Sequence, residues 1–192
     1  IRIENIEMMN KYHMTMPGRF ILQGLLKRMA EAGCELAVVE TTSEGIKQWR
    51  HYGIFYDIAI FTNLTPEHLQ AHGSFEKYKE AKGKMFKTLK NGERKIIKGY
   101  EIKKIIIVNY DDLHKEYFLN FPADKKITFG TIEGADFQAE KIKNTGNGLE
   151  FFIGDERYEI KILGKFNVYN ALPAIFVGSV VGILPGVIAQ GL

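Results

Sequence analysis

Three side chains that could hold a divalent metal ion are spread over the first half of the 192-residue chain. Glu40 closes the apolar segment ELAVVE, and His68 lies in the polar segment TNLTPEHLQAHG. Lys82 lies in FEKYKEAKGKMFKTL and, at about 100° per residue, falls near the centre of an apolar helical stripe. That stripe consists of Phe75, Tyr78, Met85, Phe86 and Leu89, whereas Lys77, Lys84 and Lys87 fall away from it.

A lysine in that place has two interpretations. Its stem can be buried while the ammonium reaches water or a carboxylate. Alternatively, a buried neutral amine can add carbon dioxide and become a carbamate, an oxygen-bearing anion that suits Mg²⁺. Glu40 and His68 have similar alternatives: an acid that follows a strand is often a cap, and a lone histidine is often a hydrogen-bonded structural residue. For His72, beside a turn glycine, the structural interpretation is favoured.

Three apolar runs predict the strands that would bring these residues together. They cover residues 35–40, 57–63 and 103–112, with helical patterns between them, which predicts an α/β fold with a mostly parallel sheet. Each run ends in polar residues, at Glu40, Asn63 and Asn109. Ligands of open α/β sheets bind outside the carboxyl ends of the strands. The sequence therefore predicts a ligand site at this edge.

Helices and a second β layer complete the predicted fold. Residues 16–33 form a predicted helix with Thr15 and Pro17 at its start. Thr65 with Pro66, and then Ser74, predict two further helix starts. After residue 125, the runs 126–132, 136–143, 149–154 and 157–163 predict a small antiparallel layer, followed by a helix that opens near Asn167. The apolar face of the first helix is predicted to contain Phe20, Ile21, Leu25, Leu26 and Met29.

Composition narrows the class of protein. The net charge is only +3 and the lysines are interspersed with acids, which favours a solvated surface over a nucleic-acid partner. The single cysteine, Cys34, lies in an apolar run, as is typical of a reduced core residue in a cytoplasmic protein. No apolar run reaches the about 18 residues of a membrane span. The chain begins with Ile1 and stops within the segment VIAQGL, so we expect a piece of a longer protein. The sequence gives no prediction of the oligomeric state.

Five ordered segments between about Thr15 and Gly182 resemble motifs of the Mur ligase family, in particular its MurE-type ligases of UDP-N-acetylmuramoyl-dipeptide. TNLTPEHLQAHG with the following YKEAK resembles the family's T-N-[IL]-x-x-D-H-L-D-x-H-G and Y-x-x-A-K. VVETTSEGIKQWR resembles E-x-S-S-x-G-x-x-x-x-R, and LGKFNVYNALPAI resembles G-x-F-N-x-x-N-x-x-A-A. TMP and VNYDD resemble T-T-P and N-x-D-D. The resemblance implies the family's central, P-loop-NTPase-like domain.

The resemblance also implies roles for individual residues. Glu40, His68 and a carbamylated Lys82 would hold Mg²⁺ and form the catalytic centre. Thr15, Thr42, Gln48 and Arg50 would hold the UDP-MurNAc-peptide. Asn63, Asn167 and Asp111 would lie at the ATP, with Asn167 at the adenine and Asp111, beside Asp112, toward the ribose. The implied reaction is ATP-dependent amide formation through an acyl phosphate, with a free amino acid, expected to be a diamino acid, as the second substrate.

The sequence departs from the family pattern in several places. The phosphate-binding loop G-x-x-G-K-[ST] does not occur in it, and neither does the family's C-terminal, amino-acid-selecting domain. We therefore interpret residues 1–192 as a truncated central domain and expect no ATP turnover from this chain alone. Glu67, Met16 and Gln70 replace the family's Asp, Thr and Asp. A folylpolyglutamate or cyanophycin synthetase type of ligase, and a non-catalytic UDP-muramoyl-peptide-binding module, remain alternatives.

Overall fold

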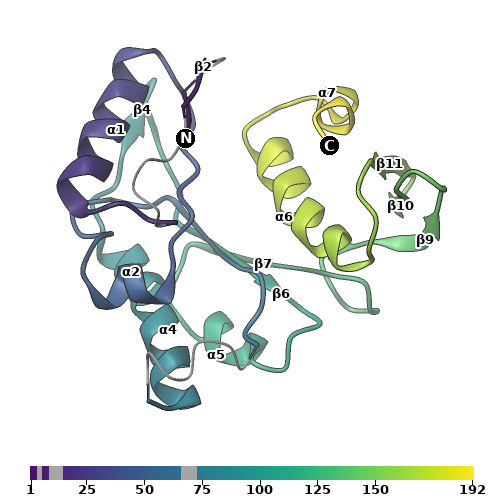
Figure 1. Ribbon diagram of the computed structural model, residues 1–192, viewed down its shortest axis with the longest axis horizontal. Coiled ribbons are helices and arrows are strands. Elements are labelled where there is room, and N and C mark those ends of the chain that lie inside the picture. The colour runs from purple at the N-terminus through teal and green to yellow at the C-terminus, as the bar shows by residue number, and fades with distance from the viewer. Residues whose placement is uncertain (4–5, 9–14, 66–72) are drawn as a thin grey trace. The chain divides into compact units, whose positions relative to one another are not determined.

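The computed structural model describes residues 1–3, 6–8, 15–65 and 73–192. Most of its elements are labelled in Figure 1. The chain divides into two compact units. The N-terminal unit comprises Ile1–Phe55 and Pro66–Thr88, and the C-terminal unit comprises Tyr56–Thr65 and Leu89–Leu192. We describe each unit by itself.

The N-terminal unit is mainly helical. A short antiparallel pair, β1 (Arg2–Ile3) and β2 (Ile6–Glu7), precedes α1 (Arg19–Glu31) and α2 (Ser43–Lys47). The predicted helix 16–33 is confirmed with shorter bounds, and Gly33, at φ 81°, follows its end in the left-handed conformation that glycine adopts readily. The predicted apolar face was wrong at its start, because Phe20 and Ile21 are exposed, at 87% and 38%, whereas Leu22 is buried.

The predicted strand at residues 35–40 is not formed. The segment has no ladder hydrogen bonds among the described residues, and Leu36 and Val38 are exposed. A run of apolar residues predicts burial, but a strand exists only where another strand pairs with its backbone. Instead, Val39 lines a pocket against α1, and Glu40 belongs to an exposed connecting segment.

Helix α4 (Phe75–Asn91) carries the predicted apolar stripe. The side chain of Ser74 accepts a hydrogen bond from the backbone N–H of Lys77 at 3.3 Å, which confirms the predicted N-cap. Tyr78, Ala81, Phe86 and Leu89 are buried. Lys82 is half-buried, whereas Lys77, Lys84 and Lys87 are exposed, as the periodicity predicted.

The C-terminal unit contains a four-stranded parallel sheet of β3 (Ile58–Phe61), β6 (Ile105–Asn109), β7 (Lys125–Gly130) and β8 (Phe137–Gln138), in that order. Two predicted strands, β3 and β6, are confirmed, and every residue of β6 is buried. The prediction that residues 126–132 and 136–138 join an antiparallel layer was wrong. Both strands pair in parallel, and β7 buries the consecutive residues 127–130 between two neighbours.

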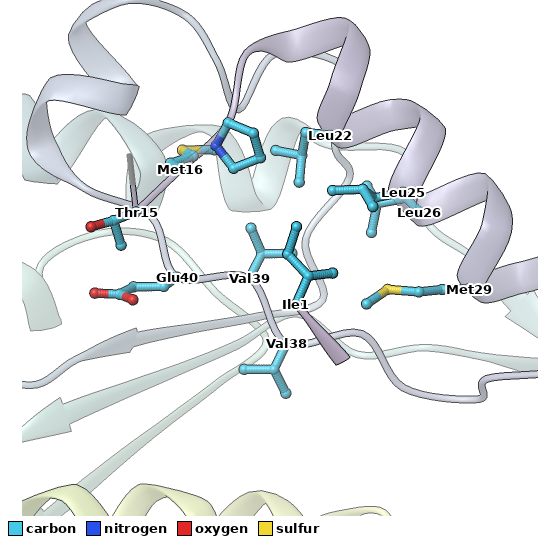
Figure 2. A pocket seen from close by; sticks show the side chains of 11 residues that line it. Ile1, Thr15, Met16, Leu22, Leu25, Leu26, Met29, Val38, Val39 and Glu40 are labelled. Atoms are coloured by element: carbon cyan, nitrogen blue, oxygen red, sulfur yellow. The ribbon is translucent and has the colours of Figure 1, made fainter. Parts of the chain in front are cut away.

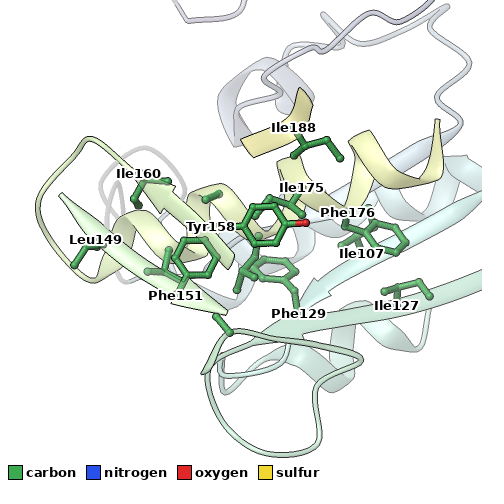
Figure 3. Packing of buried hydrophobic residues seen from close by; sticks show 14 of the residues in the cluster. Ile107, Ile127, Phe129, Leu149, Phe151, Tyr158, Ile160, Ile175, Phe176 and Ile188 are labelled. Carbon is green, nitrogen blue, oxygen red and sulfur yellow. The ribbon is translucent and has the colours of Figure 1, made fainter. Parts of the chain in front are cut away.

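The smaller sheet is antiparallel, as predicted, and consists of β9 (Glu140–Asn144), β10 (Leu149–Ile153) and β11 (Glu156–Ile160). Helices α6 (Phe166–Val180) and α7 (Pro185–Gln190) follow it, and α6 contacts both β7 and β11. Figure 3 shows the resulting core, in which Phe129 of the parallel sheet, Phe151 of the antiparallel sheet and Ile175 of α6 meet. Burial of this surface is what joins the two sheets.

Polar contacts close the amino end of the parallel sheet. A hairpin of β4 (Ile96–Ile97) and β5 (Tyr100–Glu101) precedes β6, and α5 (Lys115–Leu119) follows it. Lys104 is fully buried, and its ammonium donates to the carbonyls of Tyr56 and Glu93 at 2.8 and 3.1 Å and to the carboxylate of Asp57 at 3.1 Å. All three ammonium protons are therefore satisfied.

No helix in the described part of the chain is long and apolar enough to span a membrane.

Candidate functional site

The end of α2 brings two predicted substrate-binding residues together. The backbone N–H of Trp49 donates to the carbonyl of Ile46 at 3.0 Å, and that of Arg50 donates to the carbonyl of Gly45 at 2.9 Å. These two bonds form a Schellman motif, which requires a left-handed residue, and Trp49 occupies that position with φ 58°. The turn brings the side chains of Gln48 and Arg50 together, and the Arg50 Nε donates to the Gln48 Oε1 at 2.9 Å.

The same residues connect α2 to the segment before α1. The guanidinium of Arg50 also donates to the backbone carbonyl of Met16. At the other end of α2, the Thr42 hydroxyl accepts the N–H of Gly45 at 3.0 Å and caps the helix. Gly45 packs so closely on Met16 that a Cβ there would lie 2.6 Å from the Met16 sulfur. Thr42, Gln48 and Arg50 therefore surround one short helix, with the Thr15–Met16 backbone beside it.

A pocket in this unit contains Thr15 and Glu40. One of its walls is apolar and comes from α1 and from Val39. Figure 2 shows the Glu40 carboxylate and the Thr15 hydroxyl at one end, both pointing away from the apolar side chains. The exposed carboxylate of Glu40 is a hard oxygen ligand of the kind that Mg²⁺ prefers. The apolar wall consists of Leu22, Leu25, Leu26, Met29 and Val39.

His51 follows the α2 turn in the chain and is buried. It is only 6% exposed, and burial lowers the pKa of its imidazole; the cations Arg19 and Lys84 add to this, whereas a hydrogen bond to the Gly45 backbone opposes it. The ring is therefore neutral near pH 7. Its Nδ1 has no hydrogen-bond partner among the described residues. The indole of Trp49 stacks over this ring, with centroids 6.3 Å apart and planes inclined by 11°.

Lys82 occupies the position that helical periodicity predicted. Its ammonium lies 5.2 Å from the centroid of the Tyr78 ring, within range of a cation–π contact. The half-buried stem fits both a snorkelling ammonium and a carbamate. A second half-buried lysine on α4, Lys79, is paired with Glu76 at 2.7 Å, a contact that periodicity alone did not indicate.

The predicted metal group lies only partly within the described residues. His68 lies outside them, as do Glu67, Gln70, His72 and the predicted helix start at Pro66. Across residues 1–3, 6–8, 15–65 and 73–192, no group of three His, Cys, Asp or Glu side chains is placed to hold a metal ion. The joint role of Glu40, His68 and Lys82 stays a prediction.

In the C-terminal unit, polar side chains tie the carboxyl ends of β3 and β6 together. The Asn109 amide donates to the carbonyl of Thr62 at 2.7 Å. The Asp112 carboxylate accepts the N–H of Leu64 at 2.9 Å and, through its other oxygen, the N–H of His114 at 2.8 Å. Asn63 lies between these two ties and is exposed. The strand end therefore presents the Asn63 side chain from a fixed backbone.

Asp111 is held by the next strand and by α6. One of its oxygens accepts bonds of 2.8 Å each from the Thr131 N–H, the Thr131 hydroxyl and the Tyr169 hydroxyl. The other accepts a longer bond of 3.4 Å from the N–H of Ile132. Burial alone would raise the pKa of Asp111, but the hydrogen bonds from Thr131 and Tyr169 outweigh it and lower the pKa. A Cβ at Gly130 would lie 2.2 Å from an Asp111 oxygen, so this approach needs glycine.

Asn167 lies in the first turn of α6, close to where the sequence predicted a helix to open. Its side chain is half-buried, donates to the Leu163 carbonyl at 2.8 Å and accepts from the Asn170 amide at 3.2 Å. These two bonds fix the orientation of the Asn167 amide. The sequence did not indicate Thr131 or Tyr169, because nothing in their spacing reveals that they meet Asp111.

Comparison with known proteins decides the family. A family model described as the Mur ligase middle domain matches residues 2–178. The chain belongs to the Mur ligase family. The five motifs that carried the resemblance therefore lie in the Mur ligase middle domain.

Relatives with known names support this family assignment. Over 166 residues, the chain is 38% identical to a UDP-N-acetylmuramoyl-L-alanyl-D-glutamate–2,6-diaminopimelate ligase of Geobacillus kaustophilus, covering 83% of this chain and 32% of the relative. It is 37% identical to a UDP-N-acetylmuramyl-tripeptide synthetase of a Roseiflexus species, covering 84% of this chain and 33% of the relative. The chain thus spans about a third of the length of the curated relatives it matches.

Solved Mur ligases share the fold. The structure of a UDP-N-acetylmuramoyl-L-alanyl-D-glutamate–2,6-diaminopimelate ligase superimposes with a TM-score of 0.76 at 27% identity, over 91% of this chain and 35% of that one. MurF from Acinetobacter baumannii superimposes with a TM-score of 0.58 at 20% identity, over 72% of this chain and 29% of that one. The second likeness concerns the fold alone.

Proposed function

We propose that this chain is the ATP-using middle domain of a ligase that joins an amino acid to UDP-MurNAc-dipeptide during the synthesis of peptidoglycan precursors. The observation that carries the proposal is the 38% identity to a ligase named for that reaction across 83% of the chain. The gathering of Thr42, Gln48 and Arg50 around α2 supports it, because the motif that contains all three residues implies a substrate-binding role for each of them.

On the substrate side, we assign Thr15, Thr42, Gln48 and Arg50 to the UDP-MurNAc-peptide. The planar guanidinium of Arg50 suits a carboxylate or phosphate, which it can bind through two parallel hydrogen bonds. Its bonds to Gln48 and to the Met16 carbonyl fix its orientation before the substrate arrives. Such prior orientation reduces the ordering that binding would otherwise require.

On the nucleotide side, we assign Asn63 and Asn167 to the ATP, with the oriented Asn167 amide at the adenine. A ribose contact by Asp111 would need a lone pair that Thr131, Ile132 and Tyr169 leave unused. We therefore assign Asp111 chiefly to positioning: it joins β7 and α6, and α6 carries Asn167. Asp111 would thus act on the nucleotide indirectly, by holding α6 and with it Asn167 in place.

The proposed chemistry has two steps. The terminal carboxylate of the peptide takes the γ-phosphoryl group of ATP, which gives an acyl phosphate and ADP. The amino group of the incoming amino acid then attacks the acyl carbon, and phosphate leaves with formation of the amide bond. Bound Mg²⁺ would supply charge neutralisation, with Glu40, His68 and Lys82, as its carbamate, to hold it. A diamino acid is the proposed second substrate, since the Geobacillus kaustophilus relative is named for 2,6-diaminopimelate.

Phosphate release by the full-length protein tests the proposal. We expect ATP-dependent release that requires both UDP-MurNAc-dipeptide and one member of a panel containing lysine, meso-diaminopimelate and ornithine. Glu40→Ala and His68→Ala should abolish it, and the 192-residue chain alone should show none. Absence of release with every amino acid, from a folded full-length protein that binds ATP, would contradict the proposal.

Lys82 needs a separate experiment, because acid treatment destroys carbamates. We expect full-length Lys82→Ala to lose activity and to regain part of it with a short carboxylic acid, which can replace the missing oxygens. Lys84→Ala is the matched control, since Lys84 lies on the same helix but is exposed. A fully active Lys82→Ala enzyme would leave Lys82 as a snorkelling lysine.

A further inference from the structure

Trp49 occupies a position that is unfavourable for a tryptophan in two respects. It is the left-handed residue of the α2 Schellman motif, at φ 58°, where glycine is usual. A bulky residue in that conformation is uncommon and strained. In addition, 56% of its surface is exposed to solvent. Folding therefore gains little from this side chain, and an observed outlier of this kind points to a role in binding.

Trp49 is part of a small surface that combines aromatic rings with a cation. The edge of Tyr52 meets it, with ring centroids 6.3 Å apart and planes inclined by 72°. The guanidinium carbon of Arg19 lies 5.2 Å from the centre of the Tyr52 ring. Tyr52 is 60% exposed, and Arg19 is also exposed. We call Trp49, Tyr52 and Arg19 the Trp49 platform.

The platform has a firm base. His51 stacks beneath Trp49, is itself buried, and donates to the Gly45 backbone. Arg19 from α1 and Lys84 from α4 are the charged groups that act on His51 from the neighbouring elements. The Trp49 indole is thus supported on one side by a packed, uncharged ring.

In the chain, Trp49 stands between Gln48 and Arg50, whose side chains are hydrogen-bonded to each other. We propose that Trp49 is a further substrate-binding residue, whose exposed indole stacks on a ring of the sugar nucleotide while Arg19 attracts the adjacent negative charge. The inference rests on the proposed function, because it assumes that Gln48 and Arg50 hold the UDP-MurNAc-peptide.

The chemistry of the platform restricts the ring. An indole face binds flat or weakly polarised surfaces, such as the face of a nucleobase or the C–H face of a hexose. A guanidinium nearby favours a ring that carries phosphate or carboxylate next to it. The N-acetylated hexose of UDP-MurNAc-dipeptide meets both conditions, because its anomeric carbon carries the diphosphate. The uracil offers a flat face but is separated from the diphosphate by the ribose. Titrations with UDP alone and with MurNAc-dipeptide lacking the nucleotide distinguish them.

Replacing Trp49 by glycine separates binding from folding. Trp49→Gly in the full-length protein removes the ring and supplies the residue that the left-handed turn favours, so the thermal unfolding midpoint should stay the same or rise. By calorimetric titration, affinity for UDP-MurNAc-dipeptide should fall about tenfold or more, with ATP affinity unchanged. Trp49→Phe should restore most of the affinity. Tyr100→Ala, which removes an exposed aromatic in the C-terminal unit, is the matched control and should bind normally.

The outcomes are distinguishable. If the unaltered protein binds no UDP-MurNAc-dipeptide, the proposed function and this inference both fail. If it binds and Trp49→Gly binds equally well, only this inference is overturned. A lower unfolding midpoint in Trp49→Gly, with weaker binding that Trp49→Phe does not restore, would also overturn it, because the ring would then be a packing element.

Discussion

Two regions of the molecule treat their side chains in opposite ways. In the C-terminal unit, Lys104 and Asp111 make their hydrogen bonds inside the protein: the Lys104 ammonium has three acceptors, and the Asp111 carboxylate has four donors. In the N-terminal unit, Arg50 is only half-buried, and Trp49 stays exposed although its backbone is strained. The first pattern builds a scaffold, and the second leaves groups available to a ligand.

This difference separates the expected consequences of substitution. Removing a satisfied, buried group leaves its partners without hydrogen bonds and should lower the free energy of unfolding. Removing an exposed group changes stability little and should be detected only in binding. The four substitutions below run from the largest expected effect to the smallest.

Lys104→Ala should destabilise the protein most. It leaves the carbonyls of Tyr56 and Glu93 without their buried donor, at about 1–3 kcal/mol for each, whereas the partly exposed Asp57 carboxylate keeps its ion pair with Lys95. Equilibrium denaturation would measure this loss. Lys103→Ala, at the exposed neighbouring position, should change the free energy of unfolding by less than about 0.5 kcal/mol. Equal effects at the two positions would show that the buried contacts of Lys104 contribute nothing.

Asp111→Asn should lower the free energy of unfolding by about 2 kcal/mol at pH 7, since hydrogen bonds to a charged acceptor become hydrogen bonds to a neutral one. Because the folded state lowers the pKa of Asp111, its stabilisation is fully present above the unfolded pKa of about 3.9 and is lost as the pH falls through the folded value. The difference between Asp111→Asn and the unaltered protein should therefore shrink below about pH 4. A difference that is constant down to about pH 2 would argue against an ionised Asp111.

Arg50→Ala should weaken binding of UDP-MurNAc-dipeptide by at least about tenfold, because a charge-assisted hydrogen bond contributes about 1.5–3 kcal/mol. Its free energy of unfolding should change by less than about 1 kcal/mol, since the guanidinium is partly exposed. Arg50→Lys should bind as weakly as Arg50→Ala, because an ammonium cannot reproduce the fork. Full affinity in Arg50→Lys would mean that only the charge matters. Titration calorimetry with the full-length proteins measures both.

Thr42→Ala should have the smallest effect, about 1 kcal/mol in the free energy of unfolding, through loss of the α2 cap. Thr42→Ser keeps the hydroxyl and should be nearly neutral. If both variants unfold alike, the cap is not what holds α2. If Thr42→Ser retains affinity for UDP-MurNAc-dipeptide and Thr42→Ala does not, the hydroxyl contributes to the substrate as well.

The sequence predicted correctly those strands whose apolar pattern is matched by a neighbouring strand that pairs with them. β3 and β6 were predicted correctly, because an apolar run followed by polar residues is typical of a strand inside a parallel sheet. Residues 35–40 have the same pattern without forming a strand, since pairing depends on a neighbour that the pattern does not specify. For the same reason β7 and β8 were assigned to the wrong sheet: apolarity indicates burial but not the direction of the partner strand.

Sequence motifs indicate which candidate residues lie together only when those residues are close in the chain. Gln48 and Arg50 are two residues apart, so one turn suffices to bring them together. The partners of Asp111 lie 20 and 58 residues further along the chain, and only the tertiary fold joins them. The strained Trp49 could not be predicted either, because a tryptophan in the C′ position of a helix contradicts the usual preference for glycine.

The cross-links between β3 and β6 have a consequence for ligand affinity. Asn109 holds the carbonyl of Thr62, and Asp112 holds the N–H of Leu64, so both strand exits share one rigid framework. A molecule that touches both exits meets atoms whose relative positions are already set, and its binding requires little loss of conformational entropy in the protein.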